Sequence, residues 1–440
     1  MFCKLVLDNF KSFSHFELDL VQNKVERRAK KMAIVYGENA IGKSSIVDAF
    51  NLLSKTSNSI IALSYRTKYF GDNPFYNNPL IDKYSNSDSF VLTVSECIPI
   101  YKKIGSKGNM SLQYEGFIKA GKFVYKLVYD SKAIVGEKLF VNGEIVFAVD
   151  RYGNAQLNEN DFSSEELRKQ IKERYKMYGK NHSLLACINS LLFEINYTYS
   201  NKSTSDSLKQ FNAEINKLRI SKNENEIPFM KNFMGKLLPS LVYGEYNESL
   251  KSKLELTKIA LTMYFSSIYP QINKIDYDIS SSQDGKKYYE IVFVEENGGS
   301  ESRVSYNLSS TGTKKLLQLF PIFYEIVEDD NIVIIDEIDS GINDVLLRDI
   351  FESLGKEIKG QLIVTTHNTL LLKSVNKKYI YLLDRDENNN VISYSLDSFG
   401  RQIQDQTDII GRYLKGLYGG VPQSGAFSMD YIVDEIKYGN

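Results

Sequence analysis

The sequence has no tryptophan, only three cysteines and eight prolines among its 440 residues, and no long apolar run. Its cysteines, Cys3, Cys97 and Cys187, are widely scattered and form no CxxC or Cys/His pattern, so we expect unpaired thiols in a reducing compartment. No stretch reaches the roughly 18 apolar residues of a transmembrane helix. The N-terminus also lacks the basic start, apolar run and cleavage site of a signal peptide. We therefore expect a cytoplasmic protein that does not contact a membrane.

An excess of charge of one sign is lacking as well. Lysine and arginine number 54 against 55 aspartates and glutamates, so the formal net charge is -1. This balance does not predict a nucleic-acid-binding protein, although a local basic face would still allow DNA binding, because phosphate contacts need only a patch. The stretches 27–31 and 168–180 are basic. Exposed lysines on a helix are nevertheless most often just a solvated face.

The apolar pattern predicts an α/β fold in three parts. Residues 1–150 form a lobe rich in strands, residues 151–275 a helical insertion, and residues 276–440 a second lobe in which buried strands alternate with helices. Four segments of the first lobe predict an antiparallel sheet, and Asn142-Gly143 is a strong hairpin signal. The predicted antiparallel strands lie within residues 91–100, 112–120, 122–130 and 137–147. The predicted helices of the insertion lie within residues 163–179, 182–195, 207–220 and 249–268.

The strongest motif follows the apolar run that ends at Tyr36. Gly37 to Ser44 match GxxxxGK[ST] between a predicted strand and a predicted helix, which is the setting of a phosphate-binding loop. The backbone N–H groups of such a loop and the positive end of the helix bind phosphate oxygens. Lys43 can reach the β- and γ-phosphates of ATP, and Ser44 can coordinate Mg²⁺. The residues predicted to bind nucleotide here are Gly37, Glu38, Asn39, Ala40, Ile41, Gly42, Lys43, Ser44 and Ser45.

A second motif ends the apolar run Ile332–Ile335. Asp336 would stand at the mouth of a buried parallel strand, where it can hold Mg²⁺ directly or through water. The next residue, Glu337, is the natural general base for an attacking water. Asp-Glu pairs are common on surfaces, but a pair that ends a β-branched run is a much stronger signal. The residues 362–365 predict a neighbouring parallel strand, and His367 follows it, close to the expected γ-phosphate.

A Ser/Gly-rich loop precedes the second motif. Its residues Ser310, Thr311, Gly312 and Thr313 lead into a helix predicted to begin near Lys314, and small residues ahead of a helix form an anion site. Loops of this composition are usually nothing more than loops. The loop 310–313 indicates a phosphate-binding function only when its position is considered together with the other motifs.

These motifs and their wide separation resemble the ABC-type ATPases of the RecF, RecN and SMC kind, in which an insertion splits the head. The resemblance covers about residues 1–60 and 290–420. It implies an ABC-ATPase head with a parallel core sheet and an antiparallel β-subdomain. It implies Walker A at 37–44, Walker B at Asp336-Glu337, a signature loop at 310–313, a D-loop at 340–343 and a switch histidine at His367.

The form SSTGT of the signature and the segment RYLKGLYGGVP resemble overcoming-lysogenization-defect ATPases and abortive-infection ATP-binding proteins. The resemblance implies that ATP and Mg²⁺ bind between two heads, with catalytic roles for Lys43, Glu337 and His367. It also implies a homodimer or higher oligomer through the heads. The chain would be a sensor or scaffold ATPase of a bacterial anti-phage system, working with a separate effector such as a nuclease or toxin.

Three alternatives stay open at this stage. A Toprim nuclease would need more than the acidic pair Asp384-Arg385-Asp386, which is more simply the turn after the next sheet strand. A RecF-like DNA-repair ATPase would use the basic stretches to bind DNA directly. A nucleotide-gated binding module would bind ATP and scarcely hydrolyse it. No glutamine is assigned to a Q-loop, for which Gln113 is only a weak candidate.

Overall fold

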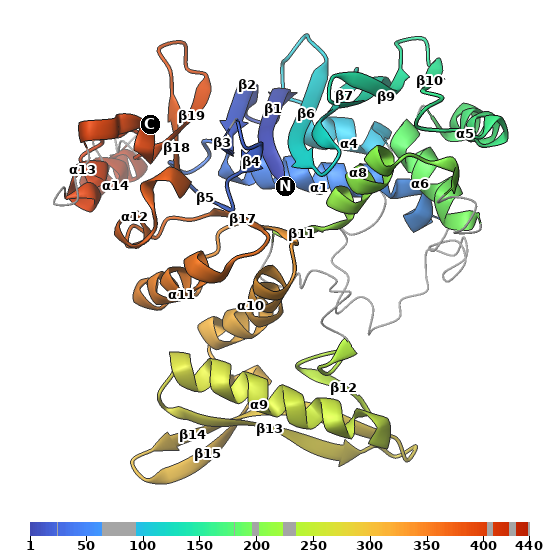
Figure 1. The fold of residues 1–440 in the computed structure, drawn as a ribbon. Coiled ribbons are helices and arrows are strands. Elements are labelled where there is room, and N and C mark those ends of the chain that lie inside the picture. Colours follow the sequence, from blue (N-terminus) through green and yellow to red (C-terminus); the bar gives the residue numbers. More distant parts are fainter. Residues whose placement is uncertain are drawn as a thin grey trace.

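The computed structural model describes residues 1–23, 25–63, 94–179, 181–195, 202–222, 235–402, 408–421 and 428–438. Its strands form a seven-stranded, a six-stranded and a four-stranded sheet and a small ribbon of β3 (Val21–Asn23) and β4 (Arg28–Ala29) (Figure 1). Within these ranges no helix has both the length and the apolar character needed to cross a bilayer. The predicted α/β fold, with a parallel core sheet and an antiparallel subdomain, is confirmed.

The six-stranded sheet is the centre of the molecule, and its first five strands run parallel. In β5, Ala33 and Val35 pack toward one apolar core while Met32, Ile34 and Tyr36 pack toward the other. Both faces are therefore buried, which explains why its strands are continuous apolar runs. In spatial order they are β11 (Leu218–Ser221), β16 (Ile332–Ile335), β17 (Gln361–Thr365), β5 (Met32–Tyr36), β18 (Ile380–Arg385) and the antiparallel β19 (Val391–Ser395).

The seven-stranded sheet is antiparallel and shares one apolar core with helix α1 (Lys43–Ser57). The predicted hairpin at Asn142-Gly143 is present, and both residues have the positive φ (53° and 86°) that a tight hairpin turn requires. The strands are β1 (Phe2–Phe10), β2 (Phe13–Asp19), β6 (Met110–Ile118), β7 (Gly121–Tyr129), β8 (Ile134–Val141), β9 (Glu144–Val149) and β10 (Ala155–Leu157).

Helices α10 and α11 cover the other face of the parallel sheet, and α9 lies beyond them with a four-stranded antiparallel sheet (Figure 1). The strands are β12 (Tyr243–Tyr246), β13 (Ile272–Ser281), β14 (Lys287–Asn297) and β15 (Ser300–Ser305). Within the described residues, the α-helices with established bounds are α1 (Lys43–Ser57), α4 (Val94–Tyr101), α5 (Glu165–Tyr178), α6 (Leu184–Glu194), α8 (Asp206–Asn216), α9 (Lys251–Ile268), α10 (Thr311–Glu328), α11 (Asp344–Glu357), α12 (Leu371–Ser374), α13 (Ile409–Leu414) and α14 (Met429–Tyr438).

Two local predictions are wrong. Of the residues 91–100 predicted to hold a strand, 94–100 lie in the helix α4, while 91–93 lie outside the described residues. The helix predicted over 207–220 stops at Asn216, and Leu218–Ser221 form β11 at the edge of the parallel sheet, because pairing with β16 outweighs local helical periodicity. The range 151–275 consequently holds strands as well as helices.

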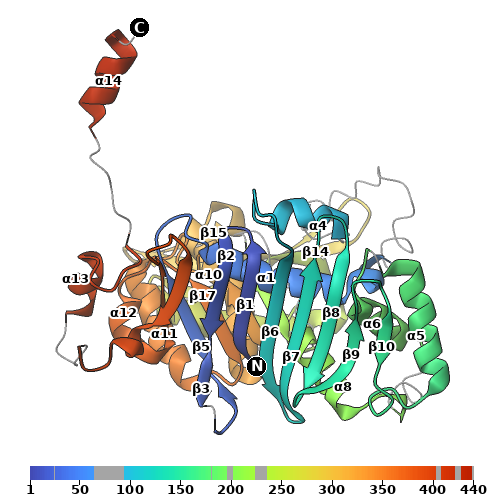
Figure 2. The same cartoon turned by 90° about the horizontal axis from the view of Figure 1, so that it is seen from above.

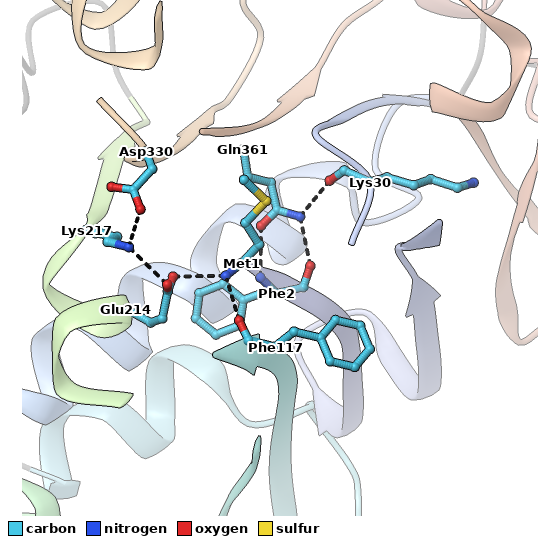
Figure 3. Close-up of polar contacts among 8 residues, drawn as sticks. All are labelled: Met1, Phe2, Lys30, Phe117, Glu214, Lys217, Asp330 and Gln361. Atoms are coloured by element: carbon cyan, nitrogen blue, oxygen red, sulfur yellow. Dashed lines mark hydrogen bonds and ion pairs between the residues drawn. The ribbon is translucent and has the colours of Figure 1, made fainter. Parts of the chain in front are cut away.

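A buried glutamine joins the two large sheets. Gln361 begins β17, and its side-chain amide donates to the carbonyl oxygens of Phe2 at 2.7 Å and Lys30 at 2.9 Å (Figure 3). Its own oxygen accepts from the N–H of Phe2 at 3.0 Å. The N-terminal amine of Met1 lies beside this contact and binds Glu214 at 2.9 Å. These bonds fix the antiparallel sheet against the parallel sheet that carries the predicted site.

A fully buried carboxylate holds the start of α6. Glu137 of β8 accepts hydrogen bonds from the backbone N–H groups of Leu184 and Leu185 and from the hydroxyl of Tyr125. Burial raises its pKa from the ordinary 4.5 to about 7, although these three donors lower it. Since the folded state keeps its proton to a higher pH than the unfolded chain, the free energy of unfolding falls as pH rises between about 4.5 and 7.

We expect Glu137→Gln to remove this pH dependence, because glutamine does not titrate. Glu137→Ala should lower the free energy of unfolding by about 3 kcal/mol, since it leaves buried donors without an acceptor. The start of α6 also contacts α1, because the hydroxyl of its N-cap residue Ser183 donates to the carbonyl oxygen of Thr56 in α1 at 3.3 Å. Urea unfolding across this pH range measures both effects, with Glu144→Gln on the exposed start of β9 as control. If the free energy of unfolding of Glu137→Gln falls with pH as steeply as that of the wild type, a group other than Glu137 causes the pH dependence.

Candidate nucleotide-binding site

The predicted phosphate-binding loop lies between β5 and α1. A side chain at Gly42, which has φ 120°, would come within 2.6 Å of both Ser12 and Phe13. A side chain at Gly37 would meet Ile41 at 2.9 Å. Both positions therefore require glycine, one for its backbone conformation and both for space. The loop is held closely by the N-terminal turn 11–12, which sequence reasoning did not connect with it.

Lys43 is buried at the first position of α1. Its ammonium group donates to the carbonyl oxygens of Gly37 at 2.8 Å and Glu38 at 3.0 Å. Burial lowers the pKa of Lys43, while the nearby carboxylates of Glu337 and Asp336 raise it. An ammonium group has three donors, so two loop carbonyls leave one for a phosphate oxygen. The structure thus brings the lysine of the first motif and the carboxylates of the second motif to one place.

The other predicted residues of the loop differ in exposure. Asn39, Ala40 and Ser44 are exposed, whereas Ile41 and Ser45 are buried. The hydroxyl of Ser45 faces that of Ser12 at 3.5 Å. Ser44 is thus accessible for a cation, while the side chain of Ser45 faces the protein.

Asp336 directly follows β16 and is held by a neighbour that the motif did not reveal. The hydroxyl of Thr365, the last residue of β17, donates to Asp336 Oδ1 at 2.5 Å and accepts from the N–H of Glu337 at 2.8 Å. Since β16, β17 and β5 are parallel neighbours, their carboxyl ends share one edge of the sheet, where ligands bind in open α/β sheets. Only their order in the sheet, which is not visible in sequence, identifies Thr365.

Glu337 and His367 are exposed at the same edge. Glu337 has φ 46°, a conformation that few residues adopt and that often marks functional sites. The backbone N–H of His367 donates to Asp339 Oδ2 at 3.0 Å, which ties the turn after β17 to the turn after β16. Asp339 also lies near Lys43 and contributes to raising its pKa. Asp339 is a second residue that sequence reasoning missed.

The predicted signature loop forms the start of α10. Ser310 caps the helix by accepting from the N–H of Thr313 at 3.1 Å. A side chain at Gly312 would meet the carbonyl oxygen of Gly341 at 2.7 Å, and one at Gly341 would meet Thr311 at 3.1 Å. The signature and D-loop segments of one chain therefore pack together. Ser310 and Thr311 remain exposed, and their described contacts are with this turn rather than with residues 37–44.

The C-terminal segment RYLKGLYGG packs behind the phosphate-binding loop. The hydroxyl of Tyr413 donates to the carbonyl oxygen of Gly420 at 3.2 Å, and its ring contacts that of Tyr36. A side chain at Gly420 would lie 3.7 Å from the Cα of Gly37. Asp384-Arg385-Asp386 were predicted to form the turn after a sheet strand, but Asp384 and Arg385 are the last two residues of β18, which lies beside β5, and only Asp386 begins the turn to β19.

The donor set fits Mg²⁺ with nucleotide. The residues that the structure describes contain no group of three or more His, Cys, Asp or Glu side chains arranged to hold a metal ion. The predicted ligands Ser44 and Asp336 offer one hydroxyl and one carboxylate, which suits Mg²⁺, because this ion takes few protein ligands beside phosphate oxygens and water. The buried cationic Lys43 and the loop N–H groups suit the phosphates themselves.

Comparison with solved structures finds heads of SMC proteins. They are an SmcHead bound to the C-winged helix domain of ScpA (14% identity, TM-score 0.42, 90% of this chain and 98% of that one) and an SMC head domain from Thermotoga maritima (12%, 0.41, 90% and 98%). A third is an Smc head with an extended coiled coil bound to the C-terminal domain of ScpA derived from Pyrococcus furiosus (15%, 0.41, 90% and 97%). Similarity this low carries no functional argument. No curated protein matches the chain.

A family of known domains matches residues 154–373. Its description is "AAA domain, putative AbiEii toxin, Type IV TA system". The matched span includes the predicted signature loop, Asp336, Glu337 and His367, while the phosphate-binding loop lies before it. Because the match extends over half of the sequence, the chain belongs to this family of AAA-type ATPase domains.

Proposed function

We propose that the chain binds ATP with Mg²⁺ and hydrolyses it in composite sites that two copies form together. One observation carries the proposal: buried Lys43, at the end of a glycine-dependent loop, lies near Asp336 and Glu337. Loop N–H groups and Lys43 would bind the phosphates, while Ser44 and Asp336 would hold the cation. Mg²⁺, when bound, would neutralise phosphate charge and orient the γ-phosphate.

Glu337 would take a proton from the attacking water, and His367 would help to orient that water. Thr365 would position the Asp336 carboxylate, since its hydroxyl already bonds one of the two oxygens. Asp339 would keep the His367 turn close to the D-loop through its bond to the backbone. The roles proposed for these four residues require only hydrogen bonding, electrostatic attraction or proton transfer by side chains at this edge of the parallel sheet.

The second copy would supply the signature loop. Ser310 and Thr311 are exposed at the N-terminus of the 18-residue helix α10, whose partial positive charge favours a phosphate. Within one chain this helix end packs against the D-loop, and the exposed Ser310 and Thr311 are accessible to a second copy. ATP would then act as a switch that joins two heads.

We expect Ser310→Asp to lower ATP hydrolysis about 100-fold while one chain still binds ATP, because the new carboxylate repels the γ-phosphate of the opposite copy. Aspartate is as good an N-cap as serine, so α10 should stay intact. The measurements are steady-state phosphate release and binding of an ATP analogue. Ser164→Asp at the N-cap of α5 is the matched control. Normal hydrolysis by Ser310→Asp would argue against a signature role.

We further propose that this ATPase is the nucleotide-gated sensor or scaffold of an anti-phage or abortive-infection system with a separate effector. The family description, which names a putative toxin of a Type IV TA system, supports a defence setting. Cells carrying the chain with its neighbouring genes should resist phage, and Lys43→Ala should remove resistance. The proposal fails if no phage phenotype and no co-purifying protein are found.

The basic stretches give little support to the RecF-like alternative. Lys30 is buried over the ring of Tyr381, and Lys31 donates to a backbone carbonyl. Arg174 forms an ion pair with Glu194 at 2.5 Å. Lys180, at the end of the second stretch, lies outside the described residues. These three cations have partners within the chain, and the exposed Lys169, Lys172 and Lys176 of α5 are most simply its solvated face, so the basic stretches favour DNA only weakly.

A further inference from the structure

Helix α9 has one buried face and one exposed apolar stripe. Leu256, Ile259 and Met263 are 43%, 57% and 69% exposed and follow each other at i, i+3 and i+7, which places them on one side of the helix. The opposite side, with Leu254 and Leu261, is buried against the four-stranded sheet. We call the three exposed residues the α9 stripe. Apolar residues at this spacing are typical of a helix that packs against another helix.

The α9 stripe leads to a pocket between α9, α10 and α11. The pocket has a volume of about 510 Å³ and is lined by Ser267, one turn beyond Met263, and by aromatic residues that include Tyr264, Phe320 and Tyr324. Its lining is predominantly apolar, and Glu328 and Asp349 contribute acidic groups. The pocket thus adjoins the C-terminal end of the α9 stripe.

The C-terminal helix α14 has a matching stripe. Met429, Ile432 and Ile436 are 54%, 40% and 78% exposed and follow the same i, i+3, i+7 spacing. Figure 2 shows α14 clear of the rest of the described chain. We call these residues the α14 stripe. A helix of ten residues is too short to be stable alone in water, so α14 needs a surface to pack on.

The first turn of α9 is basic, whereas that of α14 is acidic. Lys251 and Lys253 lie in the first turn of α9, whereas Asp430 and Asp434 are exposed on α14. The far end of α14 has the exposed Lys437, and the pocket at the far end of α9 has Glu328 and Asp349. A parallel arrangement of the two helices therefore pairs opposite charges at both ends. Such complementarity sets orientation more than affinity.

We propose that α14 of one chain packs along the α9 stripe of a second copy of this chain, with the C-terminal end of α14 at the pocket of that copy. In Figure 1, α10 and α11 lie between α9 and the region of α13 and α14, so α9 of the same chain is at the other end of the molecule. The exchange is reciprocal in a twofold dimer, which gives two such contacts. This contact needs no nucleotide and is independent of the ATP-dependent association of the heads.

Light scattering of the nucleotide-free chain in EDTA should give twice the mass of 50.3 kDa. Ile432→Glu with Ile436→Glu should give the monomer mass, and so should Ile259→Glu with Met263→Glu, because each change puts carboxylates into an apolar contact. The control is Ile104→Glu, which changes a 96% exposed residue outside both stripes, and this variant should remain a dimer. A monomeric wild-type chain would overturn the proposal.

Mixing the two double variants tests whether α14 docks in a second copy. One variant keeps α14 and the other keeps α9, so the mixture should recover dimers with one intact contact, although each variant alone is monomeric. A mixture that stays monomeric would mean that α14 packs on its own chain or on another protein, and would overturn the proposal. If a double variant does not fold, Asp434→Lys should still weaken wild-type dimerisation about tenfold by placing like charges together. Unchanged dimerisation of Asp434→Lys would contradict the arrangement.

Discussion

Glu337→Gln should stop ATP hydrolysis and leave ATP binding intact, and ATP should then hold two copies together. Glutamine keeps the size and backbone preference of glutamate, which matters because residue 337 has φ 46°. It cannot accept a proton from water, so we expect hydrolysis to fall at least about 100-fold. With hydrolysis blocked, the ATP-bound form accumulates. Phosphate release measures the first effect, and light scattering with and without ATP measures the second.

The matched control is Glu173→Gln, which removes an exposed carboxylate of α5 and should behave as the wild type. The dimerisation assay is best carried out with the α14 stripe disrupted, so that only ATP can bring two copies together. Wild-type turnover by Glu337→Gln would show that another group is the base. Loss of turnover together with loss of binding would mean that Glu337 supports the loop rather than the chemistry.

Lys43→Ala should weaken ATP binding about 100-fold. The ammonium group is the cation of the phosphate-binding loop, and each charge-assisted hydrogen bond to a phosphate contributes about 1.5–3 kcal/mol. The same group holds the carbonyl oxygens of Gly37 and Glu38, so its loss should also loosen the loop. Calorimetric titration with ATP–Mg²⁺ measures the affinity.

Lys55→Ala, in the last turn of the same helix, is the control for this prediction. ATP should raise the melting temperature of the wild type and of Lys55→Ala, because a ligand that binds only the folded state stabilises it. It should leave that of Lys43→Ala unchanged. Undiminished stabilisation of Lys43→Ala by ATP would place the nucleotide elsewhere.

Much of the fold was accessible from the sequence because the buried strands carry their own signals. The apolar runs 332–335 and 362–365 are strands, and Asn142-Gly143 makes its turn. The failures came where a partner strand or helix decides the structure. Leu218–Ser221 continue a helical pattern but pair with β16, and the apolar stretch 94–101 forms a helix. Short apolar runs do not distinguish strand from helix without their neighbours.

The candidate site shows the same division. Lys43 lies in one short continuous motif, and Asp336 and Glu337 lie in another. Each motif is recognisable in the sequence alone, so these three residues could be predicted from it. Thr365 and Asp339 contact this site across neighbouring strands and turns. Their identification needed the strand order β16-β17-β5, because no short motif encodes which strand lies beside which. The proposed pairing of two copies likewise depends on how two folded chains fit together, which no short motif encodes.

The claim that two copies form each ATP site can be tested by mixing Lys43→Ala with Ser310→Asp. In a mixed dimer, the intact loop of one chain faces the intact signature of the other, so one of the two sites is complete. The mixture should regain hydrolysis that neither variant has alone, up to about a quarter of the wild-type rate, because half of the randomly formed dimers are mixed. A mixture no more active than its components would contradict a site shared between two chains.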